Sequence, residues 1–193
     1  MHSSAPDEHE GGNVSPSIVV ISAKMHTGKT TLSNLLVERG NYVRASFAEP
    51  MKELVKVLGL PPTRKVFQTM GHKGRQIIGD DVWVRSFYNR YGELPRLVVD
   101  DMRYENEYAF LMGNNAKFIR LTCDEPTRWE RYKTSDKYQK GVTKKAWAAR
   151  LEHPTETQLD DLRFHWDCNI DTSRLDIEQV FDQMVAHVPG ILS

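Results

Sequence analysis

The stretch ISAKMHTGKTTLSNLL, Ile21–Leu36, decides the fold class of this chain. It fits the P-loop pattern of a small residue, four free positions and then Gly-Lys-Thr, with Ala23 where that pattern usually begins with glycine. The apolar, β-branched run Ser17–Ser22 directly before it is typical of a buried parallel strand, and a helical pattern follows. This context favours a phosphate-binding loop over a surface turn that contains Gly-Lys-Thr by chance.

Each residue of the loop has a predicted role. Backbone N–H groups converge on a phosphate at the start of a helix, and Gly28 lets the backbone come close to it. Ala23 only turns the chain out of the strand, where alanine is tolerated if its φ stays negative. Lys29 is expected to reach the terminal phosphates and the hydroxyl of Thr30 to ligate magnesium. The predicted ATP-binding residues of the loop are Ala23, Gly28, Lys29, Thr30 and Thr31. Lys24 and His26 are expected to face solvent or graze the phosphates, and they receive no chemical role.

Composition limits the class of partner. The 193 residues fit one domain, and 26 basic residues balance 26 acidic ones, so no global basic field exists to bind long nucleic acid or an anionic membrane. Cys123 and Cys168 form no CxxC pair and the histidines are scattered, which argues for a reducing compartment and against structural zinc. No signal peptide or membrane span is evident, so we expect a soluble, cytoplasmic protein.

Polar residues 1–16 are expected to form a disordered arm, and residues 17–193 a single domain. Alternating strand and helix patterns predict an α/β fold with a five-stranded parallel sheet and helices on both faces. The predicted strands are Ser17–Ser22, Asn41–Phe47, Arg96–Asp101, Ala116–Thr122 and Cys168–Thr172. The predicted helices are Thr30–Glu38, Pro50–Gly59, Asn106–Gly113, Glu125–Lys133, Lys145–Glu152 and Leu175–Val188.

Residues 63–91 are predicted to be mostly helical, with a break at the Gly-His-Lys-Gly of Gly71–Gly74 and a cap at Asp80 or Asp81.

A P-loop indicates that the chain binds a nucleotide, but it does not indicate which reaction the chain catalyses. The guanine-reading Asn-Lys-x-Asp and the Asp-x-x-Gly of a GTPase switch do not occur in the sequence. A non-catalytic ATP-binding regulator, or a kinase that passes the terminal phosphate to a small acceptor, remains.

Three further segments, taken with the P-loop, resemble the deoxynucleoside monophosphate kinases of bacteriophages. They are FAEPMKE at Phe47–Glu53, DDMRYENE at Asp100–Glu107 and HPTETQLDD at His153–Asp161. The four segments keep the family's order from roughly Ile18 to the last helix. The resemblance implies the three-layer P-loop kinase fold, with a helical acceptor-binding insertion at about residues 50–95 and a lid at about residues 128–145.

The same resemblance implies that the chain transfers the γ-phosphoryl of ATP to a deoxynucleoside monophosphate, with Mg²⁺ bridging the phosphates. It implies small-molecule partners, no polymeric nucleic acid and no membrane; a homodimer stays open, and a phage protein would act in the host cytoplasm. The alternatives are another small-molecule P-loop kinase, such as a dephospho-coenzyme A kinase or a phosphomevalonate kinase, and the ATP-binding regulator.

Residues that match the family's motifs carry the implied acceptor site. Asp101 and Arg103 match an Asp-x-Arg after the third strand, which suits a carboxylate near magnesium or the acceptor oxygen and a guanidinium for the acceptor phosphate. Arg75 and Trp83 look like a phosphate clamp and a ring that packs on the base. The implied substrate-binding set is Glu49, Lys52, Arg75, Trp83, Arg103 and Glu107.

Glu49 stands where the family usually has Asp, and Lys52 follows one turn later. Glu107 lies four residues after Arg103, so one helical face could hold a polar pair. The structural alternatives are a place in the core for Trp83, a helix cap for Asp100 and Asp101, and a surface ion pair for Arg103.

Arg128 and Arg131 lie three residues apart in the implied lid and therefore share a helix face. Arg128 suits stacking on adenine, and Arg131 suits neutralising the transferring phosphate; the alternative is a solvated basic helix. The catalytic set is thus Lys29, Asp101 and Arg131, and the metal ligands are Thr30 and Asp101. Glu156 could accept in a capping box and receives no role.

Overall fold

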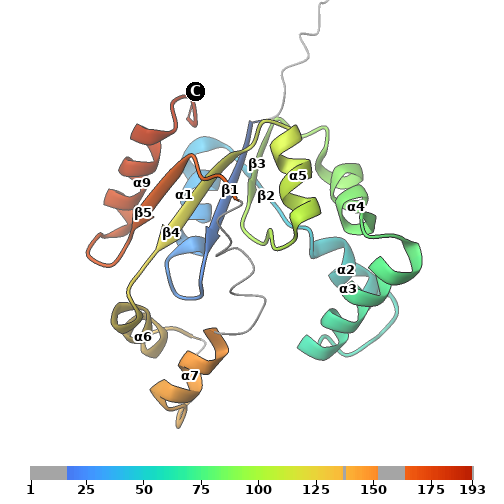
Figure 1. Ribbon diagram of the computed structural model, residues 1–193, viewed down its shortest axis with the longest axis horizontal. Coiled ribbons are helices and arrows are strands. Elements are labelled where there is room, and N and C mark those ends of the chain that lie inside the picture. Colours follow the sequence, from blue (N-terminus) through green and yellow to red (C-terminus); the bar gives the residue numbers. More distant parts are fainter. Residues whose placement is uncertain (1–16, 137, 152–163, 193) are drawn as a thin grey trace, which may run out of the picture.

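The computed structural model describes residues 17–136, 138–151 and 164–192. Its centre is a five-stranded sheet in which every neighbouring pair is parallel, in the order β2-β3-β1-β4-β5 (Figure 1). The strands are β1 Ser17–Ala23, β2 Val43–Ala45, β3 Arg96–Val99, β4 Lys117–Thr122 and β5 Cys168–Asp171. The predicted α/β fold with a five-stranded parallel sheet is confirmed, and β1 lies at its centre.

Helices cover both faces of the sheet. On one face, α1 (Lys29–Gly40) and α9 (Ile177–His187) pack on β1, β4 and β5 through a core that includes Leu36 and Met184. On the other, α4 (Val82–Tyr91) and α5 (Glu105–Gly113) form a second core around Phe87 and Leu111. Both faces of the central strand are buried, which is why its sequence is a continuous apolar run. No helix in the described ranges is both long and apolar enough to cross a membrane.

The predicted break in residues 63–91 is wrong. After α2 (Glu49–Val57), a single helix, α3 (Arg64–Ile78), continues through Gly71 and Gly74. A Cβ on Gly71 would lie 3.3 Å from the sulfur of Met51, and one on Gly74 would lie 2.7 Å from Cζ2 of Trp83. These glycines therefore allow neighbouring side chains to approach the helix closely, instead of ending it.

Asp81 does precede α4, but its side chain makes no capping hydrogen bond and instead pairs with Arg85.

A smaller cluster joins the P-loop to α6 (Glu125–Lys133) and α7 (Lys144–Leu151). Tyr132 and the fully buried Trp147 form its core, and Trp129 and Met25 pack against them. The ring of His26 lies 5.1 Å from that of Tyr132, so His26 contacts this cluster instead of only facing solvent or phosphate. Figure 1 shows α6 and α7 on one side of the P-loop end of the sheet, and α2 and α3 on the other.

The predicted arm of residues 1–16 and the segment His153–Asp161, with Glu156, lie outside the described residues.

Candidate functional site

The loop between β1 and α1 has the backbone geometry that a phosphate-binding loop needs. Gly28 is the N-cap of α1 and adopts φ 106°, a left-handed conformation that favours glycine. No atom lies within 4 Å of the point where a Cβ on Gly28 would stand, so the space beside its backbone is open. Ala23 is the last residue of β1 and is not among the positive-φ residues, which meets the condition set for alanine there.

Two large pockets meet beside this loop. The P-loop pocket, about 860 Å³, is lined by Ala23, Gly28, Lys29, Thr30 and Thr31, the residues predicted to bind ATP. The second, which we call the acceptor pocket, has about 1180 Å³ and is lined mainly by α2, α3, α4 and the segment after β3. The structure brings all six predicted substrate-binding residues to it: Glu49, Lys52, Arg75, Trp83, Arg103 and Glu107. Asp100, Asp101 and Arg103 line both pockets and so mark where they join.

The carboxylate of Asp101 is engaged by the loop that follows β2. Its Oδ2 accepts a 2.6 Å hydrogen bond from the hydroxyl of Ser46 and one of 3.0 Å from the backbone N–H of Ala48, and its Oδ1 accepts one of 3.1 Å from Phe47 N–H. These bonds hold the start of α2. Asp101 also lines the P-loop pocket, so its role as a metal ligand and catalytic carboxylate stays a prediction.

The neighbouring Asp100 makes its hydrogen bond and ion pair with other elements than Asp101 does. It accepts a hydrogen bond from the Ser33 hydroxyl of α1 at 3.4 Å and pairs with Arg44 of β2. Asp100 lines the P-loop pocket together with Lys29 and Thr30. The sequence gives Asp100 no role beyond a helix cap, although its position at the carboxyl end of a predicted strand is visible there.

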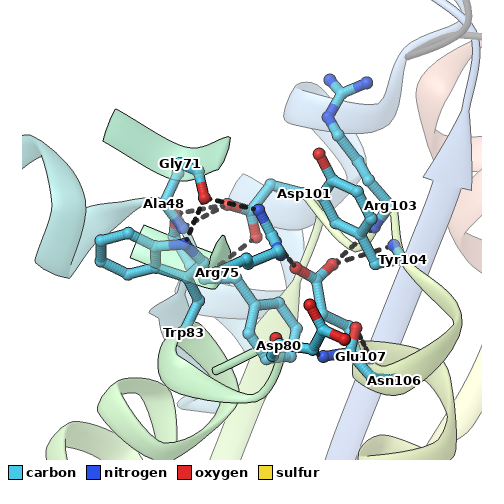
Figure 2. Close-up of polar contacts among 12 residues, drawn as sticks. Ala48, Gly71, Arg75, Asp80, Trp83, Asp101, Arg103, Tyr104, Asn106 and Glu107 are labelled. Atoms are coloured by element: carbon cyan, nitrogen blue, oxygen red, sulfur yellow. Dashed lines mark hydrogen bonds and ion pairs between the residues drawn. The ribbon is translucent and has the colours of Figure 1, made fainter. Parts of the chain in front are cut away.

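Glu107 is the most strongly perturbed group of the acceptor pocket (Figure 2). Its side chain is almost fully buried, and that burial raises its pKa to about 7, although backbone N–H groups of Arg103 and Tyr104 and the charge of Arg75 act in the opposite direction. One oxygen accepts from Arg103 N–H at 2.8 Å and Tyr104 N–H at 3.2 Å, and the other from Arg75 at 3.1 Å. Glu107 thereby fixes the turn into α5.

The expected side-chain pair between Glu107 and Arg103 is therefore replaced by a bond to the Arg103 backbone. Figure 2 shows the Arg103 guanidinium extending away from the Glu107 carboxylate.

Arg75, expected as a phosphate clamp, is held by protein groups on three sides. Besides Glu107, it donates to the carbonyl of Gly71 at 3.2 Å, and its guanidinium lies 3.7 Å from the ring centre of Tyr104. Trp83 is buried and donates from Nε1 to the same Gly71 carbonyl at 3.0 Å, so it is both core and pocket wall.

The remaining pair in the acceptor pocket is closer to solvent: Glu49 and Lys52 form an ion pair with each other at 3.2 Å.

The two arginines of α6 lie in different surroundings: Arg131 lines the P-loop pocket, where a group near the transferring phosphate is expected, and Arg128 does not. Arg131 donates to the carbonyl of Thr27 at 3.2 Å, to the hydroxyl of Thr172 at 3.0 Å and to the carbonyl of Thr172 at 2.7 Å, so it fastens the P-loop to the end of β5. Arg128 is buried, and no group hydrogen-bonds its Nε or Nη1 within the described part of the chain. It lines a third, smaller pocket next to Lys29 and not the P-loop pocket.

Magnesium bound with a nucleotide fits the groups that are present. The described residues contain no cluster of three or more His, Cys, Asp or Glu side chains that could hold a metal ion alone. Mg²⁺ usually retains several waters and takes one or two protein oxygens plus substrate phosphates. Thr30 and Asp100, a hydroxyl and a carboxylate on the same pocket, provide such oxygens.

Comparison with known proteins agrees with this geometry. The family model of the AAA domain matches residues 19–152. No curated protein matches the chain. Among solved structures, a gluconokinase from Sinorhizobium meliloti 1021 is 16% identical with a TM-score of 0.53 (90% of this chain and 91% of that one covered).

A shikimate kinase from Bacteroides thetaiotaomicron is 12% identical with a TM-score of 0.53 (88% and 97% covered). The tunicamycin resistance protein of Deinococcus radiodurans is 20% identical with a TM-score of 0.51 (90% and 96% covered). At these identities the similarity shows the fold, which is that of P-loop small-molecule kinases, and the match over residues 19–152 shows that the chain belongs to the AAA domain family.

Proposed function

We propose that this protein is an ATP-dependent kinase that phosphorylates deoxynucleoside monophosphates to diphosphates. The observation that carries the proposal is the junction of the two large pockets at Asp100 and Arg103. A nucleotide on the P-loop and an acceptor in the neighbouring pocket would meet at this junction. Transfer between two bound small molecules depends mostly on positioning and charge neutralisation, and this arrangement offers both.

The acceptor pocket suits a nucleoside in size and lining. Its volume of about 1180 Å³ exceeds what a sugar alone needs, and the aromatic side chains Phe47, Phe67, Trp83, Tyr91 and Tyr104 contribute to its wall. Aromatic rings favour stacking with a planar base. The polar groups of the wall, among them Arg64 and His72, provide donors for the base and sugar.

The chemical step is a substitution at phosphorus. An oxygen of the acceptor's phosphate attacks the γ-phosphorus of ATP, and the bond from that phosphorus to the bridging oxygen breaks, so ADP leaves with the electron pair. A phosphate oxygen is already anionic at neutral pH and needs no general base. Lys29 neutralises charge on the transferring group, Arg103 holds the acceptor's phosphate, and Asp101 positions the loop before α2.

Bound magnesium would supply charge neutralisation between the phosphates, with Thr30 and Asp100 as its protein ligands. Small-molecule partners and a cytoplasmic location accompany this proposal.

A coupled assay of ADP formation tests the proposal. The acceptor panel contains the four deoxynucleoside monophosphates, dephospho-coenzyme A, phosphomevalonate, gluconate and shikimate, with the folded Lys29→Ala variant as the blank. We expect turnover with at least one deoxynucleoside monophosphate and little with the other compounds. Faster turnover with one of the other acceptors would replace the proposed substrate, and saturable ATP binding without any turnover would indicate a regulator.

A further inference from the structure

Cys123 is the more exposed of the two free cysteines, and it lines the third pocket. This pocket has about 200 Å³ and lies between the carboxyl ends of β1, β3 and β4 and the first turns of α6. We call it the Cys123 pocket. The sulfur of Cys123 accepts a hydrogen bond from Nη1 of Arg131 at 3.5 Å. A half-buried thiol that a small molecule can reach, next to a guanidinium, is in the surroundings in which cysteines react.

Two buried polar side chains of the same pocket lack the partners that they need. Arg128 is 9% exposed and Thr27 is 1% exposed, and both line the Cys123 pocket. Neither Nε and Nη1 of Arg128 nor the hydroxyl of Thr27 has a hydrogen-bond partner among the residues that the structure describes. Burying unsatisfied donors costs free energy, so these groups indicate an oxygen-bearing ligand in the pocket.

The start of α6 explains why Cys123 and Arg128 line one pocket. Asp124 is the N-cap of this helix, so Cys123 stands one residue before the cap and Arg128 is the fourth residue of the helix. Side chains at these two positions commonly pack against each other at the start of a helix. An oxygen bound at the sulfur of Cys123 is therefore placed to accept hydrogen bonds from Arg128.

We propose that Cys123 is a modification site: hydrogen peroxide enters the Cys123 pocket, is held by Arg128 and Thr27, and oxidises the thiol to a sulfenic acid that weakens nucleotide binding. The inference goes beyond the proposed function, because it concerns the nucleotide site whatever the acceptor is.

The chemical step needs peroxide and no other reactant. The deprotonated sulfur attacks one peroxide oxygen, the S–O bond forms and the O–O bond breaks, and the second oxygen leaves as hydroxide with the electron pair. The hydroxide takes up the proton that the thiol released and becomes water. The sulfur is oxidised and the peroxide is reduced. Donors such as the Arg128 guanidinium and the Thr27 hydroxyl stabilise the charge that develops on the departing oxygen.

The other cysteine cannot convert the product into an intramolecular disulfide. Cys168 of β5 pairs with Ile119 of β4, and Cys123 follows Ile119 by four residues. At about 3.3 Å per residue, this places the two cysteines about 13 Å apart, whereas a disulfide needs Cα atoms within about 7 Å. The sulfenic acid therefore persists until an external thiol reduces it.

Oxidation of Cys123 affects the P-loop because the two pockets are joined. Thr27 and Lys29 line both the Cys123 pocket and the P-loop pocket. An oxygen added to Cys123 takes up space and hydrogen-bond donors beside these residues, and it repels phosphate oxygens that approach Lys29. Nucleotide affinity should therefore fall when Cys123 is oxidised.

The first test locates the oxidation. The protein is treated with hydrogen peroxide, sulfenic acid is trapped with dimedone, and peptide masses identify the labelled cysteine. Cys168 is the internal control, since it lies in the core and burial raises the pKa of its thiol. We expect the label on Cys123 in the wild type and none in Cys123→Ser. An unlabelled wild-type Cys123, or equal labelling of Cys168, would overturn the proposal.

The second test concerns the donors. Arg128→Met keeps the length and apolar packing of the side chain, and Arg85→Met changes an exposed arginine that pairs with Asp81 outside the pocket. The rate of oxidation is divided by the rate of alkylation with iodoacetamide, which reports access to the sulfur. We expect this ratio to fall about tenfold in Arg128→Met and to stay unchanged in Arg85→Met.

Should Arg128→Met not fold, as judged by thermal melting, Thr27→Val provides the decision. It removes only the unpartnered hydroxyl, and the ratio should fall about fivefold, as for one neutral hydrogen bond. An unchanged ratio in whichever of these variants folds would refute the role of the donors.

The third test measures nucleotide binding by titration with Mg²⁺ and a non-hydrolysable ATP analogue. We expect peroxide to weaken binding to the wild type about tenfold, dithiothreitol to restore it, and Cys123→Ser to keep its affinity after peroxide. Oxidised methionines are not restored by dithiothreitol, so the reversal identifies the thiol. Labelling of Cys123 without any change in affinity would refute the effect on the nucleotide site. None of these readouts requires phosphorylation of a deoxynucleoside monophosphate, so the inference and the proposed function can fail separately.

Discussion

Asp100 and Asp101 are adjacent in sequence, but their carboxylates serve different parts of the site. Asp100 contacts Ser33 of α1 and Arg44 of β2 on the P-loop side. Asp101 accepts three hydrogen bonds from the segment Ser46–Ala48, which begins the acceptor side. Asp100 thus contacts α1 and β2, and Asp101 holds the loop that leads into α2.

This division predicts different effects for the isosteric substitutions Asp101→Asn and Asp100→Asn. Asp101→Asn replaces an acceptor by an NH₂ group opposite backbone N–H donors, so we expect the free energy of unfolding to fall by about 1–3 kcal/mol. Asp100→Asn should cost less stability but weaken the magnesium dependence of ATP binding. Urea unfolding and ATP titration with and without Mg²⁺ measure both effects. If only Asp101→Asn loses the magnesium dependence, the original assignment of Asp101 as metal ligand is restored.

Arg131 is expected to contribute more to stability than to phosphoryl transfer. Arg131→Met removes the bonds from the guanidinium to Thr27 and Thr172 and leaves only the direct bond from the Thr172 hydroxyl to the Thr27 carbonyl, so we expect a loss on the order of 2–4 kcal/mol in the free energy of unfolding. Arg39→Met is the control, because Arg39 forms an exposed pair with Glu178 and should lose much less. An Arg131→Met protein with wild-type stability and reduced turnover would indicate that Arg131 acts on the transferring phosphate.

Much of the fold was predictable because it depends on local patterns. β1 and β3 are apolar, β-branched runs with both faces buried, and β1 leads directly into the P-loop, so strand, loop and helix follow from adjacent residues. The places of the six substrate-binding residues on one pocket were likewise expected. What could not be predicted depends on partners distant in sequence. Arg131 and Thr27 are 104 residues apart, and nothing in the spacing of Arg128 and Arg131 tells which of them meets a carbonyl.

Other signals were present but ambiguous. Arg120 lies inside β4 between the buried Ile119 and Leu121, and sequence reasoning gave this charged residue no role. The two glycines of α3 are typical of a helix break in the sequence, and their close packing against Met51 and Trp83 is evident only from the fold.

Substitutions of Arg103 test whether this residue binds the acceptor specifically or contributes to nucleotide binding in general. Arg103→Ala is expected to lower kcat/KM for the acceptor by the equivalent of about 2–4 kcal/mol, as for the loss of a desolvated, charged hydrogen-bond partner. Arg103→Lys should recover part of the loss, because an ammonium cannot reproduce the planar fork. Separate titrations of ATP and dGMP, followed by steady-state kinetics, provide the measurement. Equal weakening of both ligands, or of neither, contradicts the assignment.

Glu107 should make stability depend on pH near neutrality. Its pKa is about 7 in the folded protein against 4.5 as the ordinary value, so the folded state holds the proton where the unfolded state has released it. Stability therefore falls as pH rises from about 4.5 through 7, by about 3 kcal/mol at most. Glu107→Gln removes this titration, and the difference between the unfolding free energies of the two proteins should change from pH 5 to pH 8. Parallel pH profiles would show that Glu107 is ionised throughout this range.

A substitution of Gly74 tests whether α3 needs glycine at this position. The expected reason is that Trp83 packs against the helix there. A Cβ at this position would stand 2.7 Å from Cζ2 of Trp83, and the indole cannot retreat without losing its hydrogen bond to the carbonyl of Gly71. Overpacking of this kind outweighs the gain in helix propensity, so Gly74→Ala should lower the free energy of unfolding by about 1–3 kcal/mol. Gly113→Ala at the end of α5 is the matched control, because no atom lies within 4 Å of its Cβ position and the change should stabilise by about 0.5–1 kcal/mol. Urea unfolding of both variants at one pH provides the measurement. If Gly74→Ala is as stable as Gly113→Ala, the indole of Trp83 does not pack against this turn of α3. Its place in the wall of the acceptor pocket must then be revised.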